Sequence, residues 1–98
     1  MNIIKTREGD TLRVALEGRL DAITCRQLEG ALRTEVSDIK KLDFDLADLA
    51  YISSGGIRVL LAAYQAMSGQ GEMVIRNVQP DVMEIFEFTG LTDVLTII

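Results

Sequence analysis

The residues with the most potential for chemistry lie in three polar segments, each expected to follow a strand or precede a helix. These are residues 18–21 (Gly-Arg-Leu-Asp), 45–48 (Asp-Leu-Ala-Asp) and 53–56 (Ser-Ser-Gly-Gly). In open α/β sheets, function collects at the carboxyl ends of strands, where helices begin. Residues 53–56, called the serine segment below, combine two hydroxyls with two glycines.

The serine segment admits two interpretations. A serine at the start of a helix caps unpaired backbone N–H groups, and the same N–H groups and the helix dipole accommodate an anion such as phosphate. Gly55 and Gly56 are poor helix formers, but glycine lets the chain turn sharply and lets another surface approach closely. The segment is therefore either a helix cap or a serine that accepts or binds phosphate.

Several other chemistries are excluded by composition. The chain has no histidine and one cysteine, Cys25. A Ser-His-Asp triad, a Cys/His zinc cluster and an intrachain disulfide cannot be built. Gly55-Gly56 lacks the spacing and the lysine of a phosphate-binding loop. The sequence therefore offers none of these catalytic, metal-binding or phosphate-binding sites.

A cluster of acidic residues, Asp43, Asp45 and Asp48, suggests a metal site at first sight. A calcium loop that starts at Asp43 needs glycine at its sixth position and glutamate at its twelfth, and Asp48 and Ser54 stand there instead. We expect a solvated acidic rim without a metal. Cys25 shares a helical face with Leu28 and Leu32, which favours a small buried core residue over a reactive thiol.

Length and charge limit the partners. The 98 residues, 48% hydrophobic and 26% charged, predict a single domain over residues 1–98 with its own core. The net charge is −5 and the basic residues are scattered, so nucleic acid is not an expected partner. No apolar run approaches the ~20 residues that span a bilayer. We expect a cytoplasmic protein without membrane insertion.

The elements that position these residues follow from periodicity and turn signals. Apolar alternation around a Gly9 turn predicts an antiparallel hairpin whose second strand closes at Gly18. Pro80 marks the start of the last helix and Gly90 its end. The expected strands are 3–4, 12–16, 42–46, 73–75 and 94–98, and 47–52 is a loop. The helices are expected to start near residue 22, just after the serine segment, and at Pro80.

The first helix is expected to reach Ser37, and the second is apolar on two sides, which favours packing against both a sheet and another helix. The order β-β-α-β-α-β-α-β indicates an α/β domain. Strand-helix-strand crossovers after the hairpin imply a mostly parallel sheet with helices packed on it.

Residues 45–61, DLADLAYISSGGIRVLL, resemble the signature of the STAS domain family, D-L-x-x-V-x-[FY]-[IM]-[DS]-S-[SAG]-G-[LI]. Residues 18–21 resemble the family's G-[ED]-[LI]-D segment, and residues 86–91 resemble its F-x-x-[ST]-G-L ending. The resemblance covers nearly the whole chain and agrees with the expected order of elements. Soluble bacterial members of this family are anti-sigma factor antagonists.

The resemblance implies a partner-switching regulator and not an enzyme, so we expect no cofactor. The unphosphorylated antagonist would bind a serine kinase that is also an anti-sigma factor, phosphorylation of a serine would release it, and a PP2C-type phosphatase would reset it. On matching positions the phosphorylated residue is Ser54. Ser53 stands where aspartate is frequent, which leaves a second hydroxyl as the second choice.

The resemblance also implies a partner-binding surface around this serine. Asp21 and Asp45 match residues that line the site, and Gly56 matches the glycine after it. Ser53, Gly55 and Arg58 belong to the same surface but depart from the usual residue types.

Two alternatives stay open. One is a STAS-type subunit or scaffold of a transport or signalling complex, without phosphorylation switching. The other is a small-ligand or nucleotide-binding module that uses the same helix N-terminus.

Overall fold

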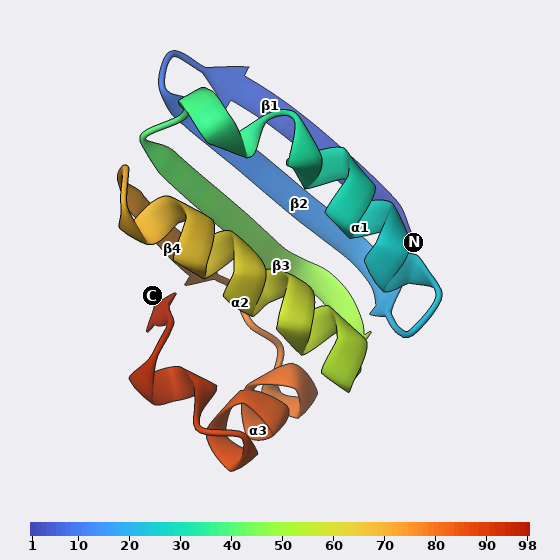
Figure 1. The fold of residues 1–98 in the computed structure, drawn as a ribbon. Coiled ribbons are helices and arrows are strands. Elements are labelled where there is room, and N and C mark those ends of the chain that lie inside the picture. The colour runs from blue at the N-terminus through green and yellow to red at the C-terminus, as the bar shows by residue number, and fades with distance from the viewer.

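A computed structural model describes all residues, 1–98, as a mixed five-stranded sheet with helices packed on it (Figure 1). The strands lie side by side in chain order; the first pair is antiparallel and the others are parallel, as the sequence predicts. The strands are β1 (Asn2–Glu8), β2 (Thr11–Leu20), β3 (Lys41–Ile52), β4 (Glu72–Arg76) and β5 (Thr96–Ile97).

Two helices, α1 (Thr24–Arg33) and α2 (Ser54–Ser68), run next to each other across one face of the sheet (Figure 1). The third, α3 (Pro80–Phe88), contacts β3 and the short 3-10 turn η2 (Leu91–Asp93). Gly90 ends α3 in the left-handed conformation, φ 78°, which glycine adopts without steric cost. The predicted α/β class and element order are confirmed. The second helix starts earlier than predicted, because α2 begins at Ser54 and includes Gly55 and Gly56.

The core lies between the sheet and the helices. Leu12, Val14 and Leu16 alternate along β2 and are at most 1% exposed, and Leu42 and Phe44 continue this face on β3. Leu28 and Leu60 contribute from α1 and α2. Each fully buried side chain of this size stabilises the fold by roughly 1.5–3 kcal/mol relative to exposure, so the core fixes the helices against the strands.

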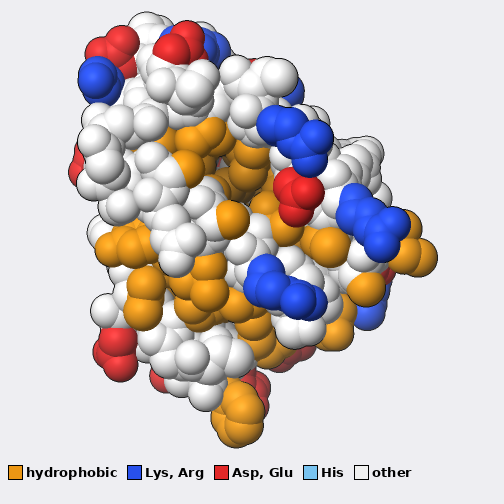
Figure 2. Space-filling view, viewed as in Figure 1, with side chains coloured by type: hydrophobic (Ala, Val, Ile, Leu, Met, Phe, Trp, Pro, Cys, Tyr) orange, Lys and Arg blue, Asp and Glu red, His pale blue; other side chains and the backbone are white.

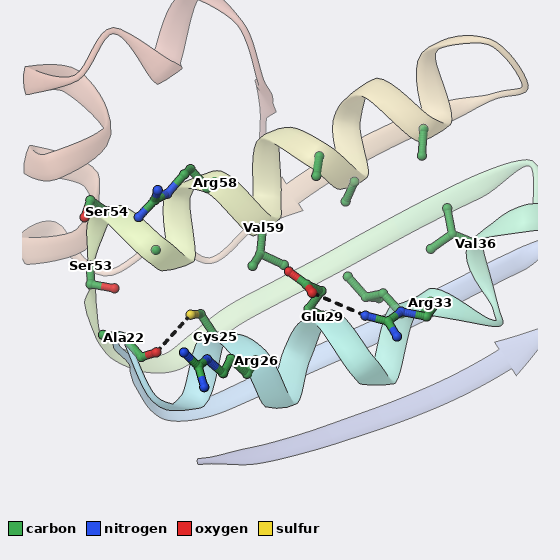
Figure 3. A pocket seen from close by; sticks show the side chains of 15 residues that line it. Ala22, Cys25, Arg26, Glu29, Arg33, Val36, Ser53, Ser54, Arg58 and Val59 are labelled. Carbon is green, nitrogen blue, oxygen red and sulfur yellow. Dashed lines mark hydrogen bonds and ion pairs between the residues drawn. The ribbon is translucent and has the colours of Figure 1, made fainter.

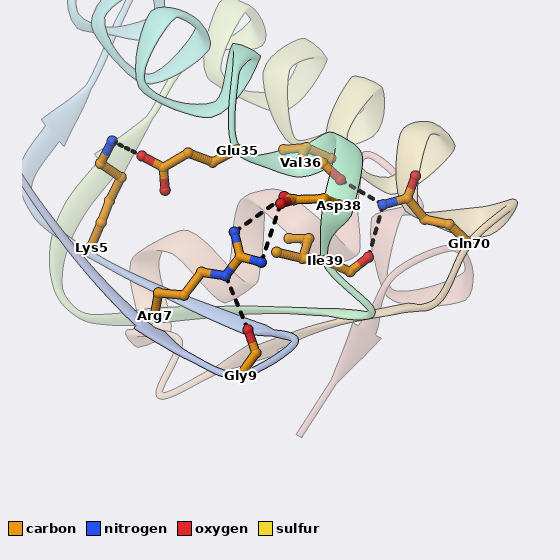
Figure 4. Close-up of polar contacts among 8 residues, drawn as sticks. All are labelled: Lys5, Arg7, Gly9, Glu35, Val36, Asp38, Ile39 and Gln70. Atoms are coloured by element: carbon orange, nitrogen blue, oxygen red, sulfur yellow. Dashed lines mark hydrogen bonds and ion pairs between the residues drawn. The ribbon is translucent and has the colours of Figure 1, made fainter.

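The first helix is shorter than its periodicity predicts, because α1 ends at Arg33 and a 3-10 turn, η1 (Val36–Asp38), follows. Polar contacts from other elements hold this turn (Figure 4). Lys5 and Arg7 of β1 form ion pairs with Glu35 and Asp38 at 2.6 and 3.1 Å, and Gln70 Nε2 donates to the Ile39 carbonyl at 2.8 Å. Tertiary contacts therefore override the helical pattern.

The expected loop at 47–52 is wrong, because β3 continues to Ile52. Relative to β2, the register of β3 shifts twice, after Asp45 and after Leu49. Each such bulge adds a residue to one strand and interrupts its alternation. Likewise, β2 does not close at Gly18 but passes through it with φ 109° to end at Leu20.

The last strand is also shorter than expected. Of residues 94–98 only Thr96 and Ile97 form β5, because η2 occupies the residues just before Val94. The Glu8-Gly9-Asp10 hairpin turn is confirmed, with Gly9 at φ 58°. None of the helices has the length and apolar composition that crossing a membrane requires.

The predicted solvated acidic rim is wrong for Asp43, whereas Asp45 is half-buried and Asp48 is exposed. Asp43 is 1% exposed, and its carboxylate pairs with Arg76 Nε at 2.8 Å and with Arg13 Nε at 3.5 Å. Arg13 lies opposite Asp43 in the β2–β3 register, and Arg76 enters from β4. The flanking strands thus cover a carboxylate that its own strand pattern places at the surface.

Candidate functional site at the serine segment

The serine segment lies where β3 passes into α2, and it is tied to the end of β2. The Ser53 N–H donates to the Leu20 carbonyl at 2.8 Å. Arg19 and Tyr51 each lie one residue before the end of their strand, and the Arg19 guanidinium stacks over the Tyr51 ring, 4.2 Å from its centroid. The carboxyl ends of these parallel strands are adjacent, which brings residues 18–21 next to residues 53–56.

The two serines differ in environment. Ser53 is the N-cap of α2: it has extended backbone angles, is half-buried, and its Oγ accepts from the Gly56 N–H at 3.3 Å. Ser54 is the first residue of α2, is exposed, and its hydroxyl makes no hydrogen bond within the protein. The sequence leaves open whether the segment caps a helix or presents a serine for phosphate. In the structure, Ser53 is the cap and its neighbour Ser54 carries the free hydroxyl.

The two glycines hold the segment close to its surroundings. A Cβ on Gly56 would meet Leu20 Cγ at 2.7 Å and Ile52 Cγ1 at 2.9 Å, so no larger residue fits without a shift of buried side chains. A Cβ on Gly55 would lie 3.1 Å from Cys25 Sγ and 3.9 Å from Ala22 Cα. The start of α2 therefore packs directly on the start of α1.

Asp21 lies beside the serine segment and organises the start of α1. Its Oδ1 accepts from the N–H groups of Thr24 and Ile23 at 2.9 and 3.0 Å and from the Thr24 hydroxyl at 3.1 Å. These hydrogen bonds hold the pKa of Asp21 below its usual value, and those from the Thr24 and Ile23 N–H groups have the largest effect. The aspartate is therefore an anion with a local structural role next to the serines.

Asp45, by contrast, is not brought to the serine segment. It lies near the middle of β3, roughly 20 Å upstream of Ile52 at about 3.3 Å per strand residue. Its Oδ1 accepts from Ala47 N–H at 3.0 Å and from Asn77 Nδ2 at 3.2 Å. This carboxylate orders the β3 bulge and the chain after β4.

The structure adds a feature that the sequence did not predict, a groove of about 1170 Å³ between α1 and α2, called the interhelix groove (Figure 3). Ser53, Ser54 and Gly55 line one end of it, and Arg58 stands on its rim. The available signal was the run of small residues on α2 (Ala62, Ala63 and Ala66), which leave space between paired helices.

Cys25 lines the same groove and is half-buried, whereas the sequence predicts a buried core residue. It packs against the core, and its Sγ donates to the Ala22 carbonyl at 3.3 Å. The reason for its partial exposure is the groove itself, which leaves one side of the side chain uncovered.

The structure is a five-stranded mixed sheet with an exposed serine at the start of a helix, and comparison with known proteins identifies its class. Residues 4–97 match the family model described as "Mlab, STAS domain". The chain belongs to the STAS domain family.

Among its relatives, the chain is 33% identical to the anti-sigma-B factor antagonist of Listeria monocytogenes, over 99% of this chain and 90% of the relative. Its fold is similar to that of the anti-sigma factor antagonist SpoIIAA in its unphosphorylated form, with a TM-score of 0.86, 19% identity, and coverage of 99% of this chain and 88% of SpoIIAA. Phosphorylated SpoIIAA from Bacillus matches with a TM-score of 0.78, 18% identity, and coverage of 99% and 91%.

Proposed function

We propose that this protein is a cytoplasmic anti-sigma factor antagonist, a partner-switching regulator without catalytic activity of its own. In its unphosphorylated form it binds a serine kinase that also acts as an anti-sigma factor, and phosphorylation of Ser54 releases it. A PP2C-type phosphatase restores the binding form. The names of its relatives support the antagonist role.

The observation that carries the proposal is the contrast between the two serines. A kinase needs a hydroxyl it can reach, and Ser54 is exposed and unbonded, whereas the Ser53 hydroxyl is half-buried and engaged with Gly56 N–H. Ser54 is therefore the better acceptor. Ser53 stands where the family frequently has aspartate. The helix keeps its N-cap all the same, because serine and aspartate both cap helices.

A phosphate on Ser54 would change binding without unfolding the domain. It adds about −1.5 to −2 charges, and at the N-terminus of α2 the helix dipole favours a negative charge. A partner docked on the same surface would instead meet a bulky dianion beside the Asp21 anion. Like charges brought together at an interface cost several kcal/mol, so we expect the affinity to fall by about a hundredfold or more.

The test incubates the purified protein with the kinase–anti-sigma factor of its own organism and ATP, and maps phosphate by mass spectrometry on the tryptic peptide 41–58. We expect phosphate on Ser54. Ser54→Ala should bind the kinase and stay unmodified, and Ser54→Asp should bind weakly. Ser53→Ala is the matched control, because it removes a neighbouring hydroxyl and should still be phosphorylated. Phosphate on neither serine would refute the assignment.

A second candidate function is a docking subunit or scaffold without phosphorylation switching. The interhelix groove supports it, because the groove offers a partner a docking surface that extends well beyond the serine segment. The two functions separate in the same experiment: a scaffold would bind its partner equally well as wild type and as Ser54→Asp.

A further inference from the structure

The interhelix groove combines an apolar floor with a basic rim. Val59 and Ala63 of α2 and Leu32 of α1 form part of the floor. Arg26 and Arg58 stand on opposite helices near the serine end, and Figure 3 shows both beside the groove. Figure 2 shows the same combination on the surface, with apolar side chains in the hollow between the helices and basic side chains to its right.

The charge at this rim is opposite to that of the molecule. The chain carries −5 overall, yet the residues lining the groove include three arginines and one acidic residue, Glu29. Glu29 is already paired with Arg33, at 3.4 Å. Arg26 and Arg58 form no ion pair or side-chain hydrogen bond within the protein, so two guanidinium groups are available to an external anion.

We propose that the interhelix groove binds an amphipathic helix of a partner protein, whose apolar face lies on the groove floor and whose flanking carboxylates pair with Arg26 and Arg58. The length fits: the lining of α2 extends from Ser54 to Ala66, which at 1.5 Å per residue is about 18 Å, or a helix of about 12 residues. The small side chains of Ala62 and Ala66 allow its backbone to approach closely. This is recognition of a helix in a groove.

The groove also explains how phosphorylation would reach the partner. Ser54 lies at its end and is four residues before Arg58 on α2, a spacing that places two side chains on the same face of a helix. A phosphate on Ser54 would therefore compete for the Arg58 guanidinium. The inference deepens the proposed function by naming the docking surface, and only this last step rests on Ser54 phosphorylation.

The test uses the full unphosphorylated chain and a synthetic helical peptide of about 14 residues, with leucines at every third or fourth position and glutamates on both sides of them. A peptide with lysines in place of the glutamates is its control. We expect the acidic peptide to shift backbone amide resonances along both α1 and α2. Arg26→Glu and Arg58→Glu should each weaken it about tenfold, because attraction becomes repulsion.

Matched variants separate the groove from general effects. Ala62 is exposed and lines the groove, whereas Gln65 is exposed on α2 outside it, so Ala62→Trp should block the peptide and Gln65→Trp should not. Lys40→Glu, at an exposed position outside the groove, controls for net charge.

Three results would overturn the inference. They are no detectable binding of the acidic peptide at about 1 mM, equal binding of the acidic and basic peptides, or equal effects of Lys40→Glu and Arg58→Glu on peptide binding. If oleate shifts the same amide resonances of α1 and α2 and the peptide does not, the groove is a lipid site, and this result would also overturn the inference. The assay contains no kinase and no ATP, so its failure leaves Ser54 phosphorylation intact, and failure of phosphorylation leaves the groove intact.

Discussion

Ser53 and Ser54 are adjacent in the chain, but their hydroxyls stand in different environments. The Ser53 hydroxyl satisfies one of the N–H groups that every helix leaves unpaired at its start, whereas the Ser54 hydroxyl satisfies none. Stability and regulation can therefore be separated by changing one serine at a time.

We predict that Ser53→Ala lowers the free energy of unfolding by about 1 kcal/mol, the usual cost of losing an N-cap. Ser54→Ala should change it by less than about 0.5 kcal/mol, because an exposed, unbonded hydroxyl is removed. Urea denaturation of both variants measures the difference. Equal losses for the two variants would contradict this assignment of the cap.

A second prediction concerns the Asp21 carboxylate. Its pKa is lowered in the folded protein from 3.8 by the N–H groups of Thr24 and Ile23, so its ionised form stabilises the fold above about pH 4 and this contribution is lost as pH falls through the lower, folded pKa. Asp21→Asn should therefore be less stable than wild type at neutral pH. The gap between the two denaturation midpoints should narrow below pH 3.8; a gap independent of pH would argue against the ionic contribution.

At the scale of elements, the site depends on how the ends of β2 and β3 meet the starts of α1 and α2. Gly56 is buried against Leu20 and Ile52, the last residues of those two strands. This close approach fixes where α2 begins and hence where Ser54 is presented. At Gly30, in the middle of α1, a Cβ would meet no heavy atom within 4 Å, so this position needs no such freedom.

We predict opposite effects of alanine at these two helical glycines. Gly56→Ala should destabilise the protein by about 1–3 kcal/mol, because its methyl group overpacks a buried contact. Gly30→Ala should stabilise it by about 0.5–1 kcal/mol through better helix propensity. Thermal unfolding of both variants checks the signs, and a stabilising Gly56→Ala would refute the close packing described here.

At the scale of the whole molecule, the sheet has two chemically different faces. One carries the apolar side chains that pack under α1 and α2, and the other carries Asp43 between Arg13 and Arg76. Hydrogen bonding and charge attraction to Asp43 raise the pKa of Arg76 above its usual value. A buried carboxylate is tolerated there because cations from both neighbouring strands reach it.

We predict that Arg76→Met lowers the denaturation midpoint, because Asp43 loses its nearest partner while remaining buried. Asp43→Leu in the same background should recover most of the loss, since the uncompensated charge is then gone. Arg13→Met is the control: its longer 3.5 Å contact and greater exposure should make its effect smaller. Failure of Asp43→Leu to rescue would show that the ion pair is not the cause.

Local sequence patterns were sufficient for the order of elements, the hairpin and the glycine that ends α3. Alternation, helical spacing and the conformational limits of glycine and proline act over a few neighbouring residues, so they can be read from the chain itself. The motif around Ser54 likewise indicated the family, which the match over residues 4–97 confirms.

Only the tertiary structure decided the length of β3, the burial of Asp43, the separation of Asp45 from the serines, and the interhelix groove. Each depends on partners distant in the chain: β3 bulges in register with β2, Arg76 covers Asp43 from β4, and the groove needs two helices side by side. The sequence by itself determined which hydroxyls stand at the helix start. The division between capping Ser53 and exposed Ser54 followed from packing, because a hydroxyl's role is set by the N–H groups that the folded chain brings within its reach.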